Sequence, residues 1–170
     1  MDLTDYIPSV ADFPIPGVSF KDITPLLASP EAFRESVDRL IEGTAGLGFD
    51  KIAAFDARGF LWAAPMAYQL ALPIIPIRKA GKLPREAVSD TYRGEYDDVV
   101  VEMHADAVGP GDRVLLVDDV IATGESMRSG CRLVERLGGT VAGCAAVIEL
   151  TFLGAAEKLT AYPVVSLVRF

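Results

Sequence analysis

The sequence is poor in the residues that usually bind metals or form disulfides. Among its 170 residues are two cysteines, Cys131 and Cys144, and one histidine, His104. Neither cysteine has a CxxC partner, so we expect no zinc site. We interpret both as small buried residues of a protein in the reducing cytoplasm. His104 is expected at a strand end and is assigned no functional role.

Positive charge is also scarce. Lysine and arginine number 16 against 24 aspartates and glutamates, which gives a net charge of −8 and an isoelectric point of about 4.6. Such a protein is a poor candidate for nonspecific nucleic-acid binding. No apolar stretch reaches the roughly 20 residues that span a bilayer, and the acidic, proline-broken N-terminus is unlike a signal peptide. We therefore expect a cytoplasmic protein with neither nucleic-acid nor membrane partners.

Apolar side chains, in contrast, are abundant. They make up 51% of the chain, enough for the core of a single domain spanning residues 1–170. Apolar runs alternate with segments of helical spacing, which indicates an α/β fold: a doubly wound, mainly parallel sheet flanked by helices. Strands are expected at residues 51–55, 74–77, 99–103, 114–117, 141–148 and 164–168.

Two regions are expected to be irregular. The first thirty residues are rich in proline, and residues 79–94 carry charges, glycines and a proline, so they are predicted to form a long loop. Ser29 and Pro30 are expected to begin a helix, because a serine hydroxyl accepts a free backbone N–H and proline suits the first helical position.

The segment VLLVDDVIATGES, residues 114–126, combines a buried-looking strand with polar residues at its end. Ligands of doubly wound sheets bind beyond the strand ends. A helix that starts after small residues presents free N–H groups and the positive end of its dipole, which suit an anion. Thr123 and Ser126 add hydroxyl donors, and Gly124 permits a close approach of the backbone. The segment therefore suits a phosphate, although the chain has neither a GxxxxGK[ST] nor a GxGxxG motif.

Asp118 and Asp119 suit a different chemical group. Ionised carboxylates only accept hydrogen bonds, so they would repel a phosphate but bind sugar hydroxyls or a hydrated Mg²⁺. A phosphate site and a diol site a few residues apart describe a ribose 5-phosphate. Spacing alone also allows a simpler interpretation, in which the aspartates are a solvated strand end and Thr123 caps a helix.

VLLVDDVIATGES resembles the phosphoribosyl-pyrophosphate (PRPP) motif of type I phosphoribosyltransferases, in which two acids and a Thr-Gly loop follow a hydrophobic strand. From Phe13 to about Leu167 the chain resembles the adenine-specific branch of that family. The further supporting segments are FPIPGVSFKDITPLL (13–27), DARGFL (56–61), IRKAGKLP (77–84), TYRGEY (91–96) and VIELTFLGAAEKL (147–159).

The resemblance implies a type I phosphoribosyltransferase fold with a small N-terminal base-binding segment. It also implies a PRPP site in which Arg58, Arg78 and Lys82 lie near the pyrophosphate. Mg²⁺ would be carried by PRPP, with contacts to Asp118 and Asp119 through water. The PRPP-binding residues expected on this basis are Arg58, Arg78, Lys79, Lys82, Asp118, Asp119, Ala122, Thr123, Gly124, Glu125 and Ser126.

The same resemblance assigns catalysis and base recognition. Residues 79–94 match a flexible catalytic loop that would exclude water. Glu95, Tyr96 and Arg58 are the expected catalytic residues, with the glutamate handling a proton at the purine. The base would be bound by Val18, Ser19, Phe20 and Lys21, largely through backbone groups. Family members that use 6-oxopurines tend to bind the oxygen of the base with a lysine near the strand that follows the PRPP motif. Residues 147–151, which match that region, contain no lysine, and this favours adenine over 6-oxopurines.

The chain departs from the family pattern at a few positions. Glu125 replaces a second glycine of the phosphate loop; we expect it to be tolerated, pointing to solvent, because backbone N–H groups would bind the phosphate. Trp62-Ala63 replaces Phe-Gly and is expected to affect helix packing. Ser19 replaces an aliphatic residue and leaves backbone recognition intact.

The resemblance implies a pentosyltransferase, an enzyme of purine salvage that makes AMP from adenine and PRPP, and a homodimer. One alternative is a phosphoribosyltransferase for another purine base, which competition between bases would distinguish. A second is a PRPP-binding regulator. Regulators of this kind usually carry an added DNA-binding domain, for which this chain has no room.

Overall fold

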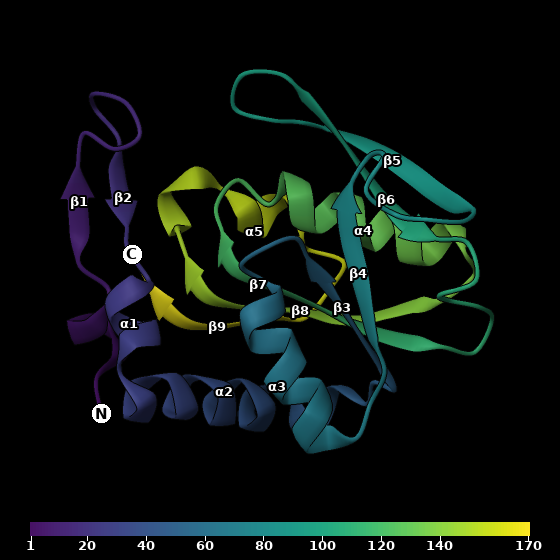
Figure 1. The fold of residues 1–170 in the computed structure, drawn as a ribbon, viewed down its shortest axis with the longest axis horizontal. Coiled ribbons are helices and arrows are strands. Elements are labelled where there is room, and N and C mark those ends of the chain that lie inside the picture. Colours follow the sequence, from purple (N-terminus) through teal and green to yellow (C-terminus); the bar gives the residue numbers. More distant parts are fainter.

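The computed structural model describes all residues, 1–170, and is built around a seven-stranded sheet in the order β5-β6-β4-β3-β7-β8-β9 (Figure 1). The strands from β4 to β9 in this order run parallel, and β6 pairs antiparallel with both β4 and β5. The predicted doubly wound, mainly parallel sheet is thus confirmed. The strands are β3 (Lys51–Phe55), β4 (Ile74–Lys79), β5 (Ala87–Arg93), β6 (Asp98–His104), β7 (Arg113–Ile121), β8 (Thr140–Glu149) and β9 (Val164–Arg169).

Helices cover both faces of the sheet. Helices α2 (Pro30–Thr44) and α3 (Phe60–Leu70) lie on one face, with the short α1 (Thr24–Ala28) beside them, and α4 (Glu125–Arg136) and α5 (Ala155–Lys158) lie on the other (Figure 1). Helix α2 begins as expected, since the Ser29 hydroxyl accepts the N–H of Ala32 at 3.2 Å. Short 3₁₀ helices occupy Leu3–Tyr6, Ala45–Leu47 and Thr151–Leu153.

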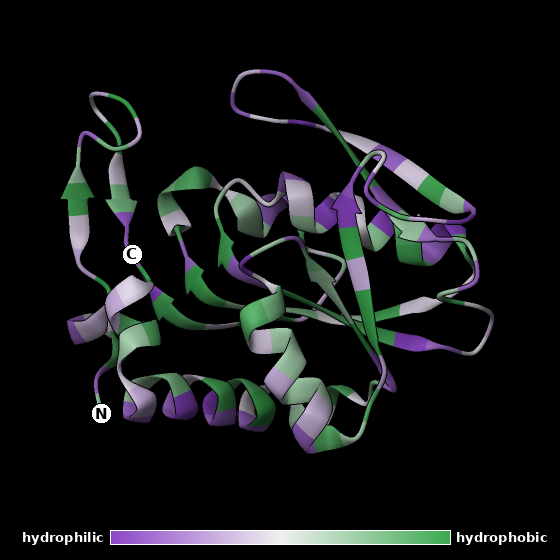
Figure 2. Cartoon of the chain, in the orientation of Figure 1, coloured by the Kyte–Doolittle hydropathy of each residue, from purple (hydrophilic) through white to green (hydrophobic).

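The core consists of two apolar clusters, one between the sheet and α2–α3 and one between the sheet and α4–α5. Residues of β8 after Thr140 are buried, which explains its nearly continuous apolar sequence. Figure 2 shows hydrophobic residues along the inner strands and alternating hydrophilic and hydrophobic stripes along α2. Trp62 is fully buried and donates to the Ser36 hydroxyl at 2.8 Å, in agreement with its expected packing role. None of the helices is both long and apolar enough to span a membrane.

The N-terminal region is more regular than the sequence suggested. Strands β1 (Ser9–Ala11) and β2 (Ser19–Lys21) pair as an antiparallel hairpin, separate from the main sheet and at one end of the molecule (Figure 1). Two of the prolines that suggested an irregular segment, Pro14 and Pro16, lie in its connecting loop, where Gly17 has a positive φ and donates its N–H to Asp12 at 2.7 Å.

The prediction of a loop over residues 79–94 is wrong for residues 87–93, which form strand β5. This is an edge strand with only one packed face, so it lacks the apolar run of an inner strand. Strand β7 also runs four residues beyond the predicted end at Val117 and includes both aspartates. The reason lies in β8, whose backbone continues to pair with β7 as far as Ile121 and Glu149.

Candidate active site

A cavity of about 110 Å³ opens where β3, β4 and β7 end. Lys79 ends β4, Asp118 lies near the end of β7, and Ser126 belongs to the first turn of α4. Parallel strands bring these residues together because their carboxyl ends share one edge of the sheet. The full lining is Phe55, Asp56, Ile77, Lys79, Tyr92, Val101, Asp118 and Ser126.

The two aspartates have different surroundings. Asp119 is 4% exposed and pairs with Arg58, whose Nε lies 2.8 Å from Oδ2 of Asp119. Asp118 faces the cavity, and its Oδ1 accepts the backbone N–H of Asp119. Burial and the neighbouring carboxylate of Asp119 raise the pKa of Asp118 well above its usual value. The charged form of Asp118 is therefore unfavourable in the free protein. A hydroxyl donor or a cation bound to its carboxylate would stabilise that form.

The turn between β7 and α4 has free backbone donors. Ala122, Thr123 and Gly124 form the turn, and the N–H groups of Ser126 and Met127 make no backbone hydrogen bond. Gly124 has a φ of +81°, and a Cβ at this position would come within 3.2 Å of the Ala155 Cα in α5. Glycine is required here by both conformation and space. The arrangement suits an anion in front of the α4 N-terminus.

Glu125 does not simply point to solvent, as the sequence suggested. Its carboxylate lies 2.9 Å from the ammonium of Lys158 in α5, and its side chain is 25% exposed. The lysine offsets the negative charge that this residue places in the turn. Sequence analysis missed this partner because the two residues are distant along the chain.

Arg58 links the turn to the N-terminal hairpin. Besides its pair with Asp119, its guanidinium lies 5.8 Å from the centre of the Phe20 ring, which also makes an edge contact with Phe13. Lys21 bonds the Ser9 hydroxyl at 2.6 Å and lies over the Phe170 ring. Val18 and Ser19 precede them in the hairpin, and Ser19 is exposed. The predicted base-binding residues thus lie on one hairpin that reaches the aspartates through Arg58.

The basic residues predicted near the pyrophosphate are only partly brought together. Arg78 pairs with Asp56 at 2.8 Å and also donates to the Lys82 carbonyl at 3.4 Å, while the side chain of Lys82 is exposed. Lys79 lines the cavity. Arg85, three residues beyond Lys82 along the chain, pairs with Asp106 at 2.7 Å on the surface.

Glu95 and Tyr96 lie in the turn of the β5–β6 hairpin, which projects from the body of the molecule (Figure 1). Neither side chain makes a hydrogen bond or an ion pair, and Tyr96 is 60% exposed. The structure therefore does not bring them to the aspartates.

Sequence analysis missed Tyr92, which lines the cavity. Burial, and to a lesser extent the charge of Asp118, raises the pKa of its phenol. The strand-forming residues Val88, Thr91 and Tyr92 were the sequence signal that could have found it, but the region had been interpreted as a loop. Asp56, the partner of Arg78, lies in the segment DARGFL and was assigned no role. It follows β3 directly, so its segment obeys the same strand-end rule as Asp118.

Comparison with known proteins agrees with this geometry. Residues 22–166 match the phosphoribosyl transferase domain family. An adenine phosphoribosyltransferase of Carboxydothermus hydrogenoformans is 49% identical over the full length of both chains. The crystal structure of adenine phosphoribosyltransferase from Thermoanaerobacter pseudethanolicus superimposes with a TM-score of 0.95 at 45% identity, covering 99% of this chain and 98% of the other.

A more distant structure is also informative. Adenine phosphoribosyltransferase from Saccharomyces cerevisiae, complexed with an imino-altritol bisphosphate and adenine, has a TM-score of 0.91 at 35% identity, with coverage of 98% and 96%. Similarity of this extent, along the whole chain and including the cavity and its turn, shows that the chain belongs to the phosphoribosyltransferase family, in its adenine phosphoribosyltransferase branch.

Proposed function

We propose that this protein transfers the 5-phosphoribosyl group of PRPP to adenine, giving AMP and pyrophosphate. One observation carries the proposal: the free N–H groups at the start of α4 and the carboxylate of Asp118 lie around a single cavity with Lys79 and Ser126. The N–H groups can donate to a phosphate, and the carboxylate can accept from sugar hydroxyls. Together they match the two ends of a ribose 5-phosphate.

Within this site, residues Ala122–Ser126 would hold the 5-phosphate and Asp118 and Asp119 the ribose hydroxyls. Glu125 would remain at the side of the turn, where Lys158 offsets its charge. Backbone N–H groups rather than cationic side chains would therefore supply most of the phosphate contacts.

The pyrophosphate would lie against the end of β4. Lys79 faces the cavity, and Arg78 and Lys82 follow the same edge. Arg58 is held by Asp119, so any contact with pyrophosphate requires this pair to open or Arg58 to use its other nitrogens. A guanidinium suits phosphate oxygens because its donors form a planar fork.

Adenine would bind at the N-terminal hairpin, with its ring against Phe20. Backbone groups of Ser19 and Lys21 would recognise the 6-amino group and N1 of adenine. Val18 would form part of the wall of the adenine site. The complex of the yeast relative with adenine supports this substrate class. Because backbone groups recognise the base, the serine at position 19 does not change the specificity.

In the reaction, a bond forms between adenine N9 and the ribose C1, and the bond from C1 to the pyrophosphate oxygen breaks. The purine loses the N9 proton, for which Glu95 is the proposed carrier, with Tyr96 beside it. Both lie on the projecting hairpin, so the β5–β6 turn must close over the substrates. Fixed charges around the leaving pyrophosphate would stabilise the transition state more than the ground state.

The residues present fit Mg²⁺ carried by PRPP. No group of three or more potential ligands forms a complete metal site. Asp118 keeps an oxygen free of protein hydrogen bonds, and Mg²⁺ typically binds through one or two carboxylates, substrate phosphates and water. When bound, the ion would neutralise the charge of the pyrophosphate; Asp118 and Asp119 would contact it through water.

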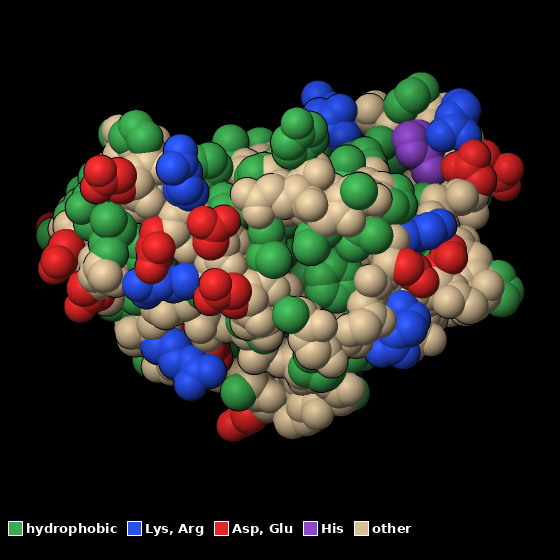
Figure 3. Space-filling view, turned by 90° about the horizontal axis from the view of Figure 1, so that it is seen from below, with side chains coloured by type: hydrophobic (Ala, Val, Ile, Leu, Met, Phe, Trp, Pro, Cys, Tyr) green, Lys and Arg blue, Asp and Glu red, His purple; other side chains and the backbone are tan.

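A homodimer in the cytoplasm is the proposed state. Leu61, Tyr68 and Ile74, on α3 and at the start of β4, are exposed, with Tyr68 at 87%. Figure 3, a view onto the α2–α3 side, shows hydrophobic atoms gathered in the middle of that face with charged side chains on both flanks. The free thiols Cys131 and Cys144, 3.7 Å apart, fit a reducing compartment.

Calorimetric titration with PRPP and Mg²⁺ tests the site directly. Asp118→Asn should weaken PRPP binding by about 10-fold or more, because it replaces a hydroxyl acceptor with an amide. Asp5→Asn, in the exposed 3₁₀ helix Leu3–Tyr6, is the matched control and should leave the affinity unchanged. Equal binding by wild type and Asp118→Asn would contradict the proposed ribose site.

A further inference from the structure

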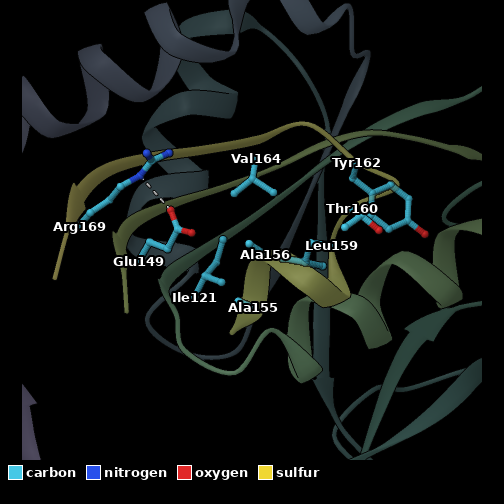
Figure 4. Close-up of a pocket in the computed structure, with 9 residues that line it drawn as sticks. All are labelled: Ile121, Glu149, Ala155, Ala156, Leu159, Thr160, Tyr162, Val164 and Arg169. Atoms are coloured by element: carbon cyan, nitrogen blue, oxygen red, sulfur yellow. Dashed lines mark hydrogen bonds and ion pairs between the residues drawn. The ribbon is translucent and has the colours of Figure 1, made fainter. Parts of the chain in front are cut away.

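A second cavity, of about 230 Å³, lies behind the phosphate turn and shares no lining residue with the first (Figure 4). Its floor is formed where β7, β8 and β9 end, by Ile121, Glu149 and Arg169, which are neighbours across the strands. Helix α5 forms the opposite wall. The cavity therefore lies outside the proposed substrate site but next to the turn that would hold the 5-phosphate.

A buried carboxylate faces this cavity. Glu149 is 8% exposed, and one of its oxygens, Oε2, accepts from the Ser166 hydroxyl at 2.6 Å and from Arg169 Nε at 3.1 Å. The other oxygen has no partner in the protein, and in Figure 4 it points away from Arg169, toward Ile121 and into the ring of lining residues. This oxygen is open to the cavity, so only water or a ligand can supply an N–H or O–H donor to it.

The rest of the lining defines the shape and polarity of that partner. Side chains of Ile121, Ala155, Leu159 and Val164 make the walls apolar. The guanidinium of Arg169, whose side chain is 65% exposed, lies beside Glu149. Only its Nε makes hydrogen bonds within the protein. A free carboxylate oxygen between apolar walls complements a flat ring that carries an amino group.

We propose that this cavity is a regulatory site for a small aminated heterocycle of the aminopyrimidine or aminopurine class. The amino group would donate to the free oxygen of Glu149, and the ring would lie between the apolar walls. Six of the nine lining residues are hydrophobic, which suits the faces of such a ring.

The wall shared with the phosphate turn supplies the coupling. Ala155 in α5 lies against Gly124, and Lys158 in the same helix pairs with Glu125 at 2.9 Å. A ligand behind α5 would therefore favour one position of this helix and, through it, one arrangement of the turn. This coupling rests on the proposed function, whereas binding of the heterocycle does not.

Binding is tested by calorimetric titration of the full chain with 4-aminopyrimidine in the presence of saturating AMP, which would occupy the proposed active site. Pyrimidine, which lacks the amino group, is the matched control ligand. We expect saturable binding of 4-aminopyrimidine and at least about 10-fold weaker binding of pyrimidine. No binding, or equal binding of both compounds, would overturn the proposal and would indicate a cavity that only water fills.

Variants locate the site. Glu149→Gln can keep an oxygen on Ser166 and Arg169 while placing an NH₂ group toward the cavity, and Ala156→Leu fills the cavity from an exposed position on α5. Both should reduce 4-aminopyrimidine binding by about 10-fold or more. Glu157→Gln, on the exposed side of the same helix, should not. Persistence of binding in both cavity variants would place the ligand elsewhere and refute the assignment.

The regulatory part is tested by the dissociation constant of PRPP with and without saturating 4-aminopyrimidine. Wild type should show a change of at least about fivefold, and Glu149→Gln none. An unchanged constant, with binding of 4-aminopyrimidine intact, would refute regulation alone. Failure to bind PRPP under any condition would instead contradict the proposed function.

Discussion

Arg58 contacts two parts of the site at once. It pairs with Asp119 in β7 and lies over Phe20 in the N-terminal hairpin. Asp119 is buried, so the pair is shielded from solvent on one side, although Arg58 is about half exposed. At the residue scale, this contact connects the sugar and base parts of the proposed site.

Asp118 is expected to lower the stability of the free protein while it strengthens the binding of PRPP. Its carboxylate is placed beside Asp119 in a partly buried position that disfavours its charge. Asp118→Asn should therefore raise the melting temperature by a few degrees at neutral pH in the absence of ligands, while it weakens PRPP binding. Thermal denaturation followed by circular dichroism measures this effect, and a lower melting temperature would show that the carboxylate stabilises the free protein.

Glu125 should be replaceable. Lys158 offsets its charge, and backbone N–H groups are the proposed phosphate ligands. The Glu125→Gly variant should keep its KM for PRPP within about threefold of wild type, since a partly exposed ion pair contributes little. Initial-rate kinetics measure this KM. A KM for PRPP that is lower by orders of magnitude in the variant would mean that the Glu125 carboxylate repels the phosphate directly.

At the scale of elements, strand β5 is held to helix α4 by a cluster around Asp90. The side chain of Asp90 is 8% exposed and accepts from the Ser129 hydroxyl at 2.6 Å, from Arg132 at 2.7 Å and from Arg136 at 2.9 Å. The helix that begins at the phosphate turn therefore also fixes the base of the projecting hairpin.

Asp90→Ala should destabilise the protein by about 2 kcal/mol, because it removes these bonds and leaves two arginines unpaired. Hydrogen exchange in residues 87–104 should become faster. Asp98→Ala, which breaks only an exposed pair with Arg93 at 3.4 Å, is the control and should change little. Equal stability of Asp90→Ala and wild type would show that the cluster does not anchor the hairpin.

The effect of Asp90 should depend on pH. Burial alone would raise the pKa of Asp90, but hydrogen bonds from Arg132 and Ser129 outweigh it and lower the pKa below its usual value of 3.8. A lowered pKa means that the ionised group stabilises the fold above that value. The stability difference between wild type and Asp90→Ala should thus persist at neutral pH and shrink as the pH falls below about 4.

The elements that the sequence predicted best are those with a local signal. β3 has the predicted bounds because an apolar run ends at Asp56, and α2 starts at its Ser-Pro cap. β5 was missed because an edge strand stabilised by Asp90 and its arginines has no apolar run. The pairs Glu125–Lys158 and Arg78–Asp56 join residues distant in the chain, so no spacing rule could predict them.

At the scale of the whole molecule, the exposed apolar residues on α3 and at the start of β4 predict self-association. Light scattering after size exclusion should give a mass about twice the 18.2 kDa of one chain. Tyr68→Glu, at the most exposed of these residues, should shift the mass toward that of a single chain because a charge would be buried at the contact. Glu157→Gln, on another face, should not. A monomeric wild type would contradict the proposed dimer.

The most direct test of the central claim is nucleotide formation from PRPP and Mg²⁺ with adenine, hypoxanthine, guanine or xanthine supplied separately. We predict AMP and pyrophosphate from adenine, with a kcat/KM at least about 100-fold above that for any 6-oxopurine, because unpaired backbone groups would disfavour the wrong base. Comparable turnover of a 6-oxopurine would leave the PRPP site in place but contradict the recognition of adenine by the N-terminal hairpin. Tight binding of PRPP without turnover of any base would contradict the transferase itself and favour a regulator.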